Sequence, residues 1–145
     1  LDMCTRWGES MRVKVKHVNL KTKEILIYKS KNGDPRTVPM TKRAYESIKP
    51  WVDGKRKNDY VWRDEITYHI LRRLIKEVKR EMDMEEDKRL TWHCTRHTCA
   101  TKMAKAGVPL LEIKQFGGWR SIAAVQVYLH TNTMALSRCV EALEN

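Results

Sequence analysis

The stretch 91–130 contains four residues whose order and spacing suit phosphodiester chemistry: His93, Arg96, Trp119 and Tyr128. A phosphate diester is anionic and reacts slowly, so attack without a metal requires fixed cations around the phosphoryl oxygens and an oxygen nucleophile. Arginine keeps its charge at any working pH and presents a planar fork that matches phosphate oxygens. A tyrosine can supply the nucleophile if nearby cations favour the phenolate, because its reference pKa is about 10. These residue types indicate an enzyme that breaks a phosphodiester bond.

Each of these residues also has a simpler interpretation. Tyr128 stands between two apolar residues, as a half-buried packing residue would, and a lone histidine such as His93 usually has its hydrogen bonds satisfied in a packed site. Trp119 has one donor, the indole N–H, which can bond a phosphate oxygen, and a large ring that can support the segment bearing Tyr128. For Trp119 we favour the supporting role.

The predicted elements of the C-terminal half are four short helices separated by glycine, proline and hydroxyl residues that mark helix ends. They are a helix over Thr95–Lys105 stopped by Gly107, a second that starts at Pro109 and ends at Gly117-Gly118, a third capped by Ser121, and a fourth from Thr133 to Leu143.

The N-terminal half predicts a small antiparallel sheet within 11–40, followed by two helices. A β-prone run at Glu24–Tyr28 and a short run at Arg36–Pro39 flank a turn at Asn32–Pro35. Helices are expected over Thr41–Lys49, stopped by Pro50, and after a cap at Asp64, with a charged exit at 81–88. The second helix has apolar residues at every fourth position, which we interpret as a core stripe: Ile66, Ile70, Leu74 and Val78. The fold class is therefore α+β and mainly helical, with a three-stranded antiparallel sheet followed by a helical bundle.

The composition favours a nucleic-acid partner. The 145 residues include 29 Lys and Arg against 18 Asp and Glu, a formal net charge of +11, and such an imbalance attracts polyanions. The length suits one domain. No run approaches the roughly 18 apolar residues of a membrane span, and the first residues lack the features of a signal peptide, so we expect a cytoplasmic protein.

The four cysteines are Cys4, Cys94, Cys99 and Cys139, and their irregular spacing predicts reduced thiols rather than a disulfide framework. His93, Cys94, His97 and Cys99 lie close in sequence, but no CxxC pair is present and a helix turns adjacent residues about 100° apart. We therefore expect no metal and interpret Cys94 and Cys99 as packing residues.

Several of these segments resemble the catalytic domain of tyrosine recombinases, the phage-integrase family. His93-Cys94-Thr95-Arg96-His97-Thr98 resembles the family's His-x-x-Arg motif, and Gly118-Trp119-Arg120-Ser121 is similar to its Gly-His/Trp element. Tyr128 follows Trp119 by nine residues, where the family has its nucleophile. Upstream, Thr5-Arg6-Trp7-Gly8-Glu9 is similar to the segment with the first catalytic arginine, and Lys31, five residues before Arg36, matches the β-hairpin lysine.

The resemblance implies six catalytic residues: Arg6, Lys31, His93, Arg96, Trp119 and Tyr128. Tyr128 would attack a scissile phosphate, form a 3′-phosphotyrosyl link and release a 5′ hydroxyl, with Lys31 donating a proton to the leaving oxygen. The two arginines would neutralise charge on the phosphorus, and no cofactor would be needed. Arg6 also has a simpler interpretation, a salt bridge to Glu9 three residues later.

The resemblance further implies that residues 1–145 are the catalytic domain of a site-specific DNA recombinase of bacterial or phage origin. The N-terminal DNA-clamping domain and the first catalytic-domain helices would be missing. A homotetramer on double-stranded DNA is implied, with protomers exchanging the C-terminal segment 133–145. Two departures stand out, because Cys4 lies near the usual glycine before the first arginine and Trp119 replaces the commoner histidine.

Three alternatives remain. A type IB topoisomerase uses similar catalytic groups, and a basic DNA-binding module without catalysis fits the charge. A zinc-stabilised interaction module is the third. A covalent adduct with DNA would separate the enzymes from the other two, and strand exchange would separate recombinase from topoisomerase.

Overall fold

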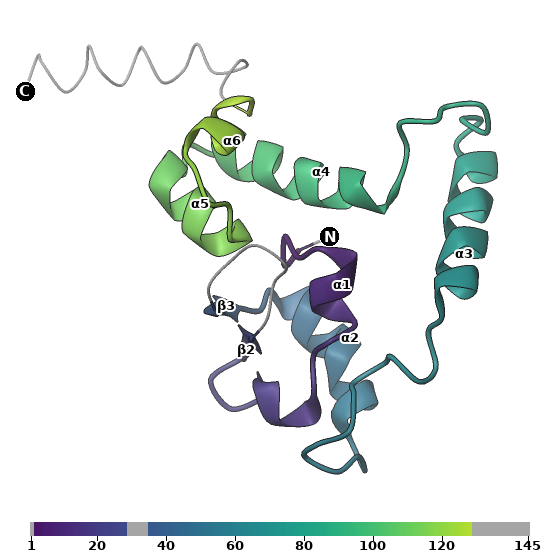
Figure 1. Cartoon of the computed structure of the whole chain (residues 1–145), viewed down its shortest axis with the longest axis vertical. Coiled ribbons are helices and arrows are strands. Elements are labelled where there is room, and N and C mark those ends of the chain that lie inside the picture. The colour runs from purple at the N-terminus through teal and green to yellow at the C-terminus, as the bar shows by residue number, and fades with distance from the viewer. Residues whose placement is uncertain (1, 29–34, 129–145) are drawn as a thin grey trace, which may run out of the picture.

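The computed structural model describes residues 2–28 and 35–128, in which a small sheet and six helices are joined in one chain (Figure 1). Most of the predicted hairpin turn and the whole predicted helix from Thr133 to Leu143 lie outside the described residues. Among the described helices, none has the length and apolar character needed to cross a membrane.

The sheet has three antiparallel strands in the order β1-β2-β3: β1 Val18–Asn19, β2 Glu24–Ile27 and β3 Arg36–Pro39. Ile25 pairs with Val38, and Ile27 pairs with Arg36. Alternate residues of β2 are buried, as expected when one face of a sheet packs on a core. The predicted sheet and fold class are confirmed.

The first hydrophobic core lies between the sheet and α2, Lys42–Val52. Ile48 of α2 packs with Val13, Ile25, Val38 and Val61.

The predicted end of α2 at Pro50 is wrong, because the helix continues to Val52. A proline removes its own N–H from the helix but leaves the donors that follow it intact, and the Asp53 N–H still donates to the Lys49 carbonyl at 3.2 Å. Thr41 caps the start of the helix, where its hydroxyl accepts from the Ala44 N–H.

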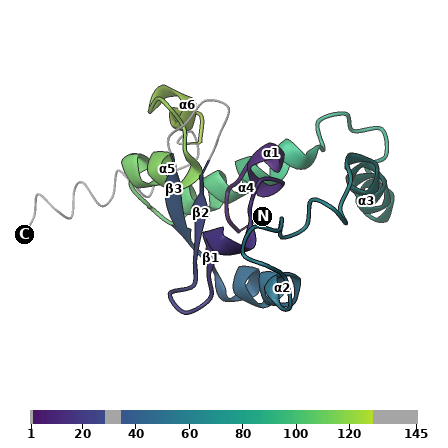
Figure 2. The same ribbon diagram turned by 60° about the horizontal axis from the view of Figure 1, so that its bottom comes forward.

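Helix α3, Tyr68–Glu81, stands apart from the other elements in both views (Figures 1 and 2). Its cap is Thr67, whose hydroxyl accepts from the Ile70 N–H, so the predicted cap at Asp64 is wrong. The second half of the predicted core stripe is also wrong: Leu74 and Val78 are 46% and 47% exposed, whereas Leu71, outside the stripe, is buried. Ile66 and Ile70, its first half, are half-buried. The periodicity identified a helix but not the face on which it packs, since that depends on where the rest of the chain lies.

The second core is helical and holds the predicted motifs. It is formed by α4 Trp92–Lys105, α5 Leu110–Gly117 and α6 Ala123–Gln126 around Ala100, Ala104, Ile113, Val125 and Tyr128. Helix α4 starts three residues before the predicted Thr95 and ends before Gly107, as expected. Gly118, with φ of 68°, ends α5 in the left-handed conformation that glycine adopts without strain. The N-cap of α6 is Ile122, one residue after the predicted Ser121, but the Ser121 hydroxyl accepts from the Ala124 N–H in the first turn of the helix.

Two short elements complete the described chain. Helix α1, Trp7–Ser10, follows Arg6 directly, and a 3₁₀ turn, η1 Val15–His17, leads into β1. The ring of Trp7 packs edge-on against Trp92 with a centroid distance of 5.5 Å. This contact holds α1 beside the first turn of α4, and so brings two of the predicted motifs together.

Candidate active site

A buried carboxylate fixes the first predicted arginine. Arg6 donates from Nη1 to Glu9 Oε1 and from its backbone N–H to Oε2, both at 2.9 Å. Glu9 is only 3% exposed and also accepts from Arg36 Nη2 at 2.9 Å. Burial alone would raise the pKa of the Glu9 carboxyl, but the hydrogen bonds from Arg36 and Arg6 outweigh it and hold the pKa below its usual value. The salt bridge considered as the simpler interpretation of Arg6 is therefore present, and it orients a side chain that stays one-third exposed.

Arg36 is a residue that motif reasoning missed. Its Nε donates to the Phe116 carbonyl at 3.0 Å while its Nη2 holds Glu9, so one guanidinium joins β3, α1 and α5. A side chain at Gly118 would collide with it, because an added Cβ would lie 2.5 Å from Arg36 Nη1. The sequence placed Arg36 at the start of a strand and after the hairpin lysine, but it did not indicate this role, which arises from contacts distant in sequence.

Arg96 is buried at the centre of the site, 2% exposed. Its Nη1 donates to the Cys4 carbonyl at 2.5 Å, and within 2–28 and 35–128 its Nη2 has no hydrogen-bond acceptor. Burial, then the charge of Arg6, lowers the pKa of Arg96 to about 10, which still leaves it cationic at neutral pH. Cys4 has φ of 50°, in the left-handed region that favours glycine, and this conformation accompanies the carbonyl contact with Arg96.

Trp119 links Arg96 to Tyr128. Arg96 Cζ lies 3.8 Å from the Trp119 ring centroid, a cation–π contact, and the ring meets Tyr128 edge-on with centroids 5.9 Å apart. The ring also covers Gly117, where an added Cβ would lie 1.8 Å from Trp119 Cζ3. This arrangement suits a supporting role for the indole, and it explains why two glycines precede it.

Tyr128 follows α6 and is 8% exposed. Its hydroxyl oxygen lies 2.6 Å from His97 Nδ1, within hydrogen-bonding distance. Burial raises the pKa of Tyr128, and the charge of Arg96 opposes this effect. The tyrosine therefore carries its proton at rest, beside an imidazole that sequence reasoning did not assign to the site.

His93 is the second residue of α4, and its ring centroid lies 4.8 Å from that of His97, one turn later. Burial is the main cause that lowers the pKa of His93, and the nearby His97, Arg96 and Arg6 lower it further. Five of the six predicted catalytic residues therefore lie in one region: Arg6, His93, Arg96, Trp119 and Tyr128. The sixth, Lys31, lies outside the described residues. The four-residue interval between His93 and His97 was the available signal for His97, because such residues share a helix face.

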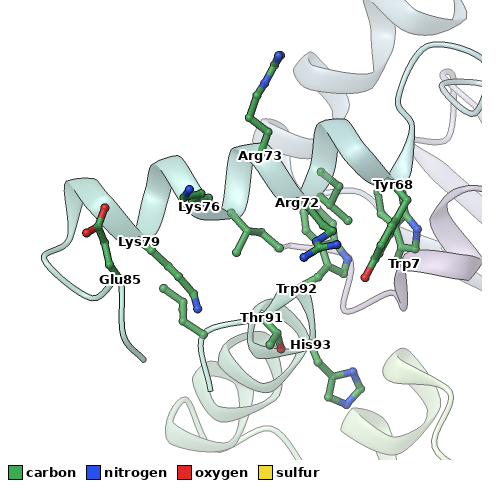
Figure 3. Close-up of a pocket in the computed structure, with 13 residues that line it drawn as sticks. Trp7, Tyr68, Arg72, Arg73, Lys76, Lys79, Glu85, Thr91, Trp92 and His93 are labelled. Atoms are coloured by element: carbon green, nitrogen blue, oxygen red, sulfur yellow. The ribbon is translucent and has the colours of Figure 1, made fainter. Parts of the chain in front are cut away.

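A groove of about 820 Å³ runs between α3 and the first turn of α4 (Figure 3). Trp7, Leu71 and Trp92 supply apolar lining, and His93 lies at its edge. In Figure 3, Arg72 and Tyr68 are directed toward the two tryptophans and Arg73 is directed away. The groove is also lined by the basic residues Arg72, Arg73, Lys76 and Lys79, which suit an anionic ligand.

The described cysteines are free thiols. Cys4 lies in the helical core, with Cys99 packed against it, and Cys94 donates to the Arg89 carbonyl at 2.7 Å. A hydrogen bond with Cys4 lowers the pKa of Cys99 to about 7. Across residues 2–28 and 35–128, no three His, Cys, Asp or Glu side chains form a group that would hold a metal ion.

Other proteins resemble this chain in sequence and in structure. It is 28% identical over 130 residues to the tyrosine recombinase XerA of Saccharolobus solfataricus, covering 90% of this chain and 43% of that protein. It is 29% identical over 130 residues to the integrase of Escherichia phage P2, covering 90% and 35%. The chain thus spans less than half the length of these relatives.

Solved structures share the fold. A crystal structure of XerA recombinase superposes with a TM-score of 0.72 and 25% identity, over 99% of this chain and 54% of that one. The Tn1549 transposon integrase in complex with transposon right end DNA gives a TM-score of 0.77 at 16% identity, over 99% and 56%. The family model described as the phage integrase family matches residues 1–134, and the chain therefore belongs to the phage integrase family.

Proposed function

We propose that this chain is the catalytic domain of a site-specific DNA recombinase that cleaves and rejoins DNA through a tyrosine. Tyr128 attacks a scissile phosphate, the 3′ phosphate becomes esterified to the tyrosine, and a 5′ hydroxyl leaves. Attack by that hydroxyl restores a diester. The observation that carries the proposal is the convergence of Arg96, Trp119 and Tyr128 from three separate segments.

The buried guanidinium supports the same chemistry. Arg96 Nη2 is a donor without an acceptor among the described residues, and such a group suits an oxygen of the pentavalent phosphate. Arg6 is more exposed and already oriented by Glu9, so it can meet a second phosphoryl oxygen. Lys31 is our candidate for the proton donor to the leaving 5′ oxygen, and His93 for a further contact to the phosphate.

The partner that fits the groove is double-stranded DNA. Helix α3 carries five basic and two acidic residues, and four of the basic ones line the groove that ends at His93: Arg72, Arg73, Lys76 and Lys79. Structural neighbours have been solved in complex with DNA, among them the recombinase XerH bound to difH substrate. We further propose assembly as a homotetramer on DNA, with the segment 133–145 exchanged between protomers, and action in the cytoplasm.

The test is trapping of the covalent intermediate. The full chain is incubated with a pool of nicked duplexes whose sequence is randomised on both sides of the nick, so that a short cleaved strand diffuses away and rejoining stops. Wild-type protein should form a denaturation-resistant protein–DNA adduct that persists with a chelator. Tyr128→Phe should abolish the adduct and keep DNA binding.

Two outcomes contradict the proposal. An adduct that still forms in Tyr128→Phe rejects the nucleophile, and a wild-type chain that binds DNA without forming any adduct favours the non-catalytic DNA-binding module. Strand exchange between two cleaved duplexes separates a recombinase from a topoisomerase, which would only relax supercoiled plasmid.

A further inference from the structure

The hydroxyl of the proposed nucleophile, Tyr128, contacts the imidazole of His97. The two atoms lie 2.6 Å apart, and the rings lie 5.5 Å apart, tilted by 55°. His97 is exposed whereas Tyr128 is 8% exposed, so the imidazole lies between a buried hydroxyl and solvent. A group in this position can receive a proton from the tyrosine and exchange it with water.

We propose that His97 is a further catalytic residue, which takes the proton of the Tyr128 hydroxyl as that oxygen attacks the phosphorus. This inference rests on the proposed function, since it needs Tyr128 to be the nucleophile. Neutral His97, protonated at Nε2, accepts the hydrogen bond at Nδ1 from the tyrosine O–H. Burial makes phenolate unfavourable at rest, so a base that acts during the attack is required.

The step balances without an added reactant. The Tyr128 O–H bond breaks and its proton passes to His97 Nδ1, while a bond forms between the tyrosine oxygen and phosphorus. The bond from phosphorus to the 5′ oxygen breaks, and that oxygen takes a proton from a separate donor, for which Lys31 is our candidate. In rejoining, the imidazolium returns its proton to the tyrosine oxygen as the 5′ hydroxyl attacks.

The contact distance and the neighbouring charged groups assign the role of general base to His97 rather than to His93. His93 faces His97 from one turn earlier on α4, and Tyr128 faces it from the segment after α6. The charge of Arg96 favours loss of the Tyr128 proton, whereas the charges of Arg96 and Arg6 lower the pKa of His93. Only His97 among these groups lies within hydrogen-bonding distance of the hydroxyl in the described chain.

The experiment compares His97→Asn with the wild-type chain in single-turnover cleavage of the nicked duplex pool, from pH 6 to pH 9. Asparagine places an amide oxygen near the position of Nδ1, so it keeps the hydrogen bond but cannot take a proton. We expect the rate at neutral pH to fall about a hundredfold with unchanged DNA binding. The remaining rate should rise about tenfold per pH unit, as hydroxide replaces the base, whereas the wild-type rate levels off.

A second variant, His97→Ala, distinguishes proton transfer by His97 from a purely structural role of its ring. His97→Ala should be equally slow, and added imidazole should restore part of its rate, because a free base can enter the vacated space. His69→Asn, an exposed histidine on α3, is the matched control and should cleave like the wild type.

The outcomes distinguish this inference from the proposed function. If His97→Asn keeps the wild-type rate and pH profile, or cleaves faster, His97 is not the base. A slow variant with an unchanged pH profile and no rescue by imidazole also overturns the inference, because it indicates support alone. An adduct in Tyr128→Phe would instead reject the proposed function itself.

Discussion

Two regions of this molecule carry positive charge in opposite ways. Around Glu9, the guanidinium groups of Arg6, Arg36 and Arg96 are partly or fully buried and hydrogen-bonded to specific acceptors. Along α3, basic side chains line an open groove on a helix that packs mainly through Leu71. Fixed cations suit a transition state whose geometry is always the same, because no reorganisation is needed as charge develops. Exposed cations suit attraction to a long polyanion, because that force depends on the number of charges more than on their positions.

If the buried region depends on charge pairing, removal of Glu9 should have the largest effect on stability. Glu9→Gln leaves Arg36, whose side chain is 10% exposed, without its counter-charge. We expect the free energy of unfolding to fall by about 3–5 kcal/mol, measured by urea denaturation at pH 7. Glu46→Gln, at an exposed position on α2, is the matched control and should change it by no more than about 0.5 kcal/mol.

The difference in stability between wild type and Glu9→Gln should depend on pH. Because the pKa of Glu9 is lower in the folded protein than its usual value of 4.5, its stabilising effect is complete above that value. The effect is lost as pH falls below 4.5 and through the folded pKa, when protonated Glu9 behaves like glutamine. The difference between wild type and Glu9→Gln should therefore shrink in acid, and a constant difference would contradict the charge-pairing account.

Within the site, the supporting role of Trp119 predicts a graded loss of cleavage. Trp119→Phe keeps a ring over Arg96 and against Tyr128, whereas Trp119→Ala leaves a cavity that lets the tyrosine move from its line of attack. Single-turnover cleavage should decrease in the order wild type, Phe, His, Ala, with Ala about a hundredfold below wild type. A Phe variant as slow as Ala would instead assign the main role to the indole N–H.

Substitution of two leucines of α3 tests which face of this helix packs. Leu71→Ala should lower the free energy of unfolding by about 2–3 kcal/mol, because that side chain is 4% exposed and packs against the rest of the chain. Leu74→Ala, at a position 46% exposed, should change it by about 0.5 kcal/mol or less. Equal losses would contradict this packing, because they would mean that Leu74 is as well packed as Leu71.

The smallest effect is expected for single charges in the groove. Arg72→Gln should weaken binding of duplex DNA about tenfold at low salt and reduce the slope of log affinity against log salt by about 1. Stability should not change, since the side chain is exposed. The same substitution at Arg43, which pairs with Asp2 near the start of α2, is the control and should leave the salt slope unaltered.

The sequence alone determined most of the local structure, apart from the end of α2 and the cap of α3, and the family-like motifs. The hairpin strands follow from β-prone runs, and Gly107, Gly118 and Ser121 mark helix ends through the conformations and hydrogen bonds that these residues favour. Motif order was enough to select Arg96, Trp119 and Tyr128, which the structure brings into contact. These features depend on residue types and on spacings of a few residues along the chain, and both can be read directly from the sequence.

Only the tertiary structure decided which face of α3 packs and which side chains orient the site. A helix with apolar residues at several angles can dock on more than one face, and here Leu71 is buried and lines one groove with Trp7 of α1 and Trp92 of α4. Arg36 holds Glu9 from a distance of 27 residues, and His97 meets Tyr128 from 31 residues away. Such contacts form because separate elements pack on a common core, and no local pattern in the sequence specifies that packing.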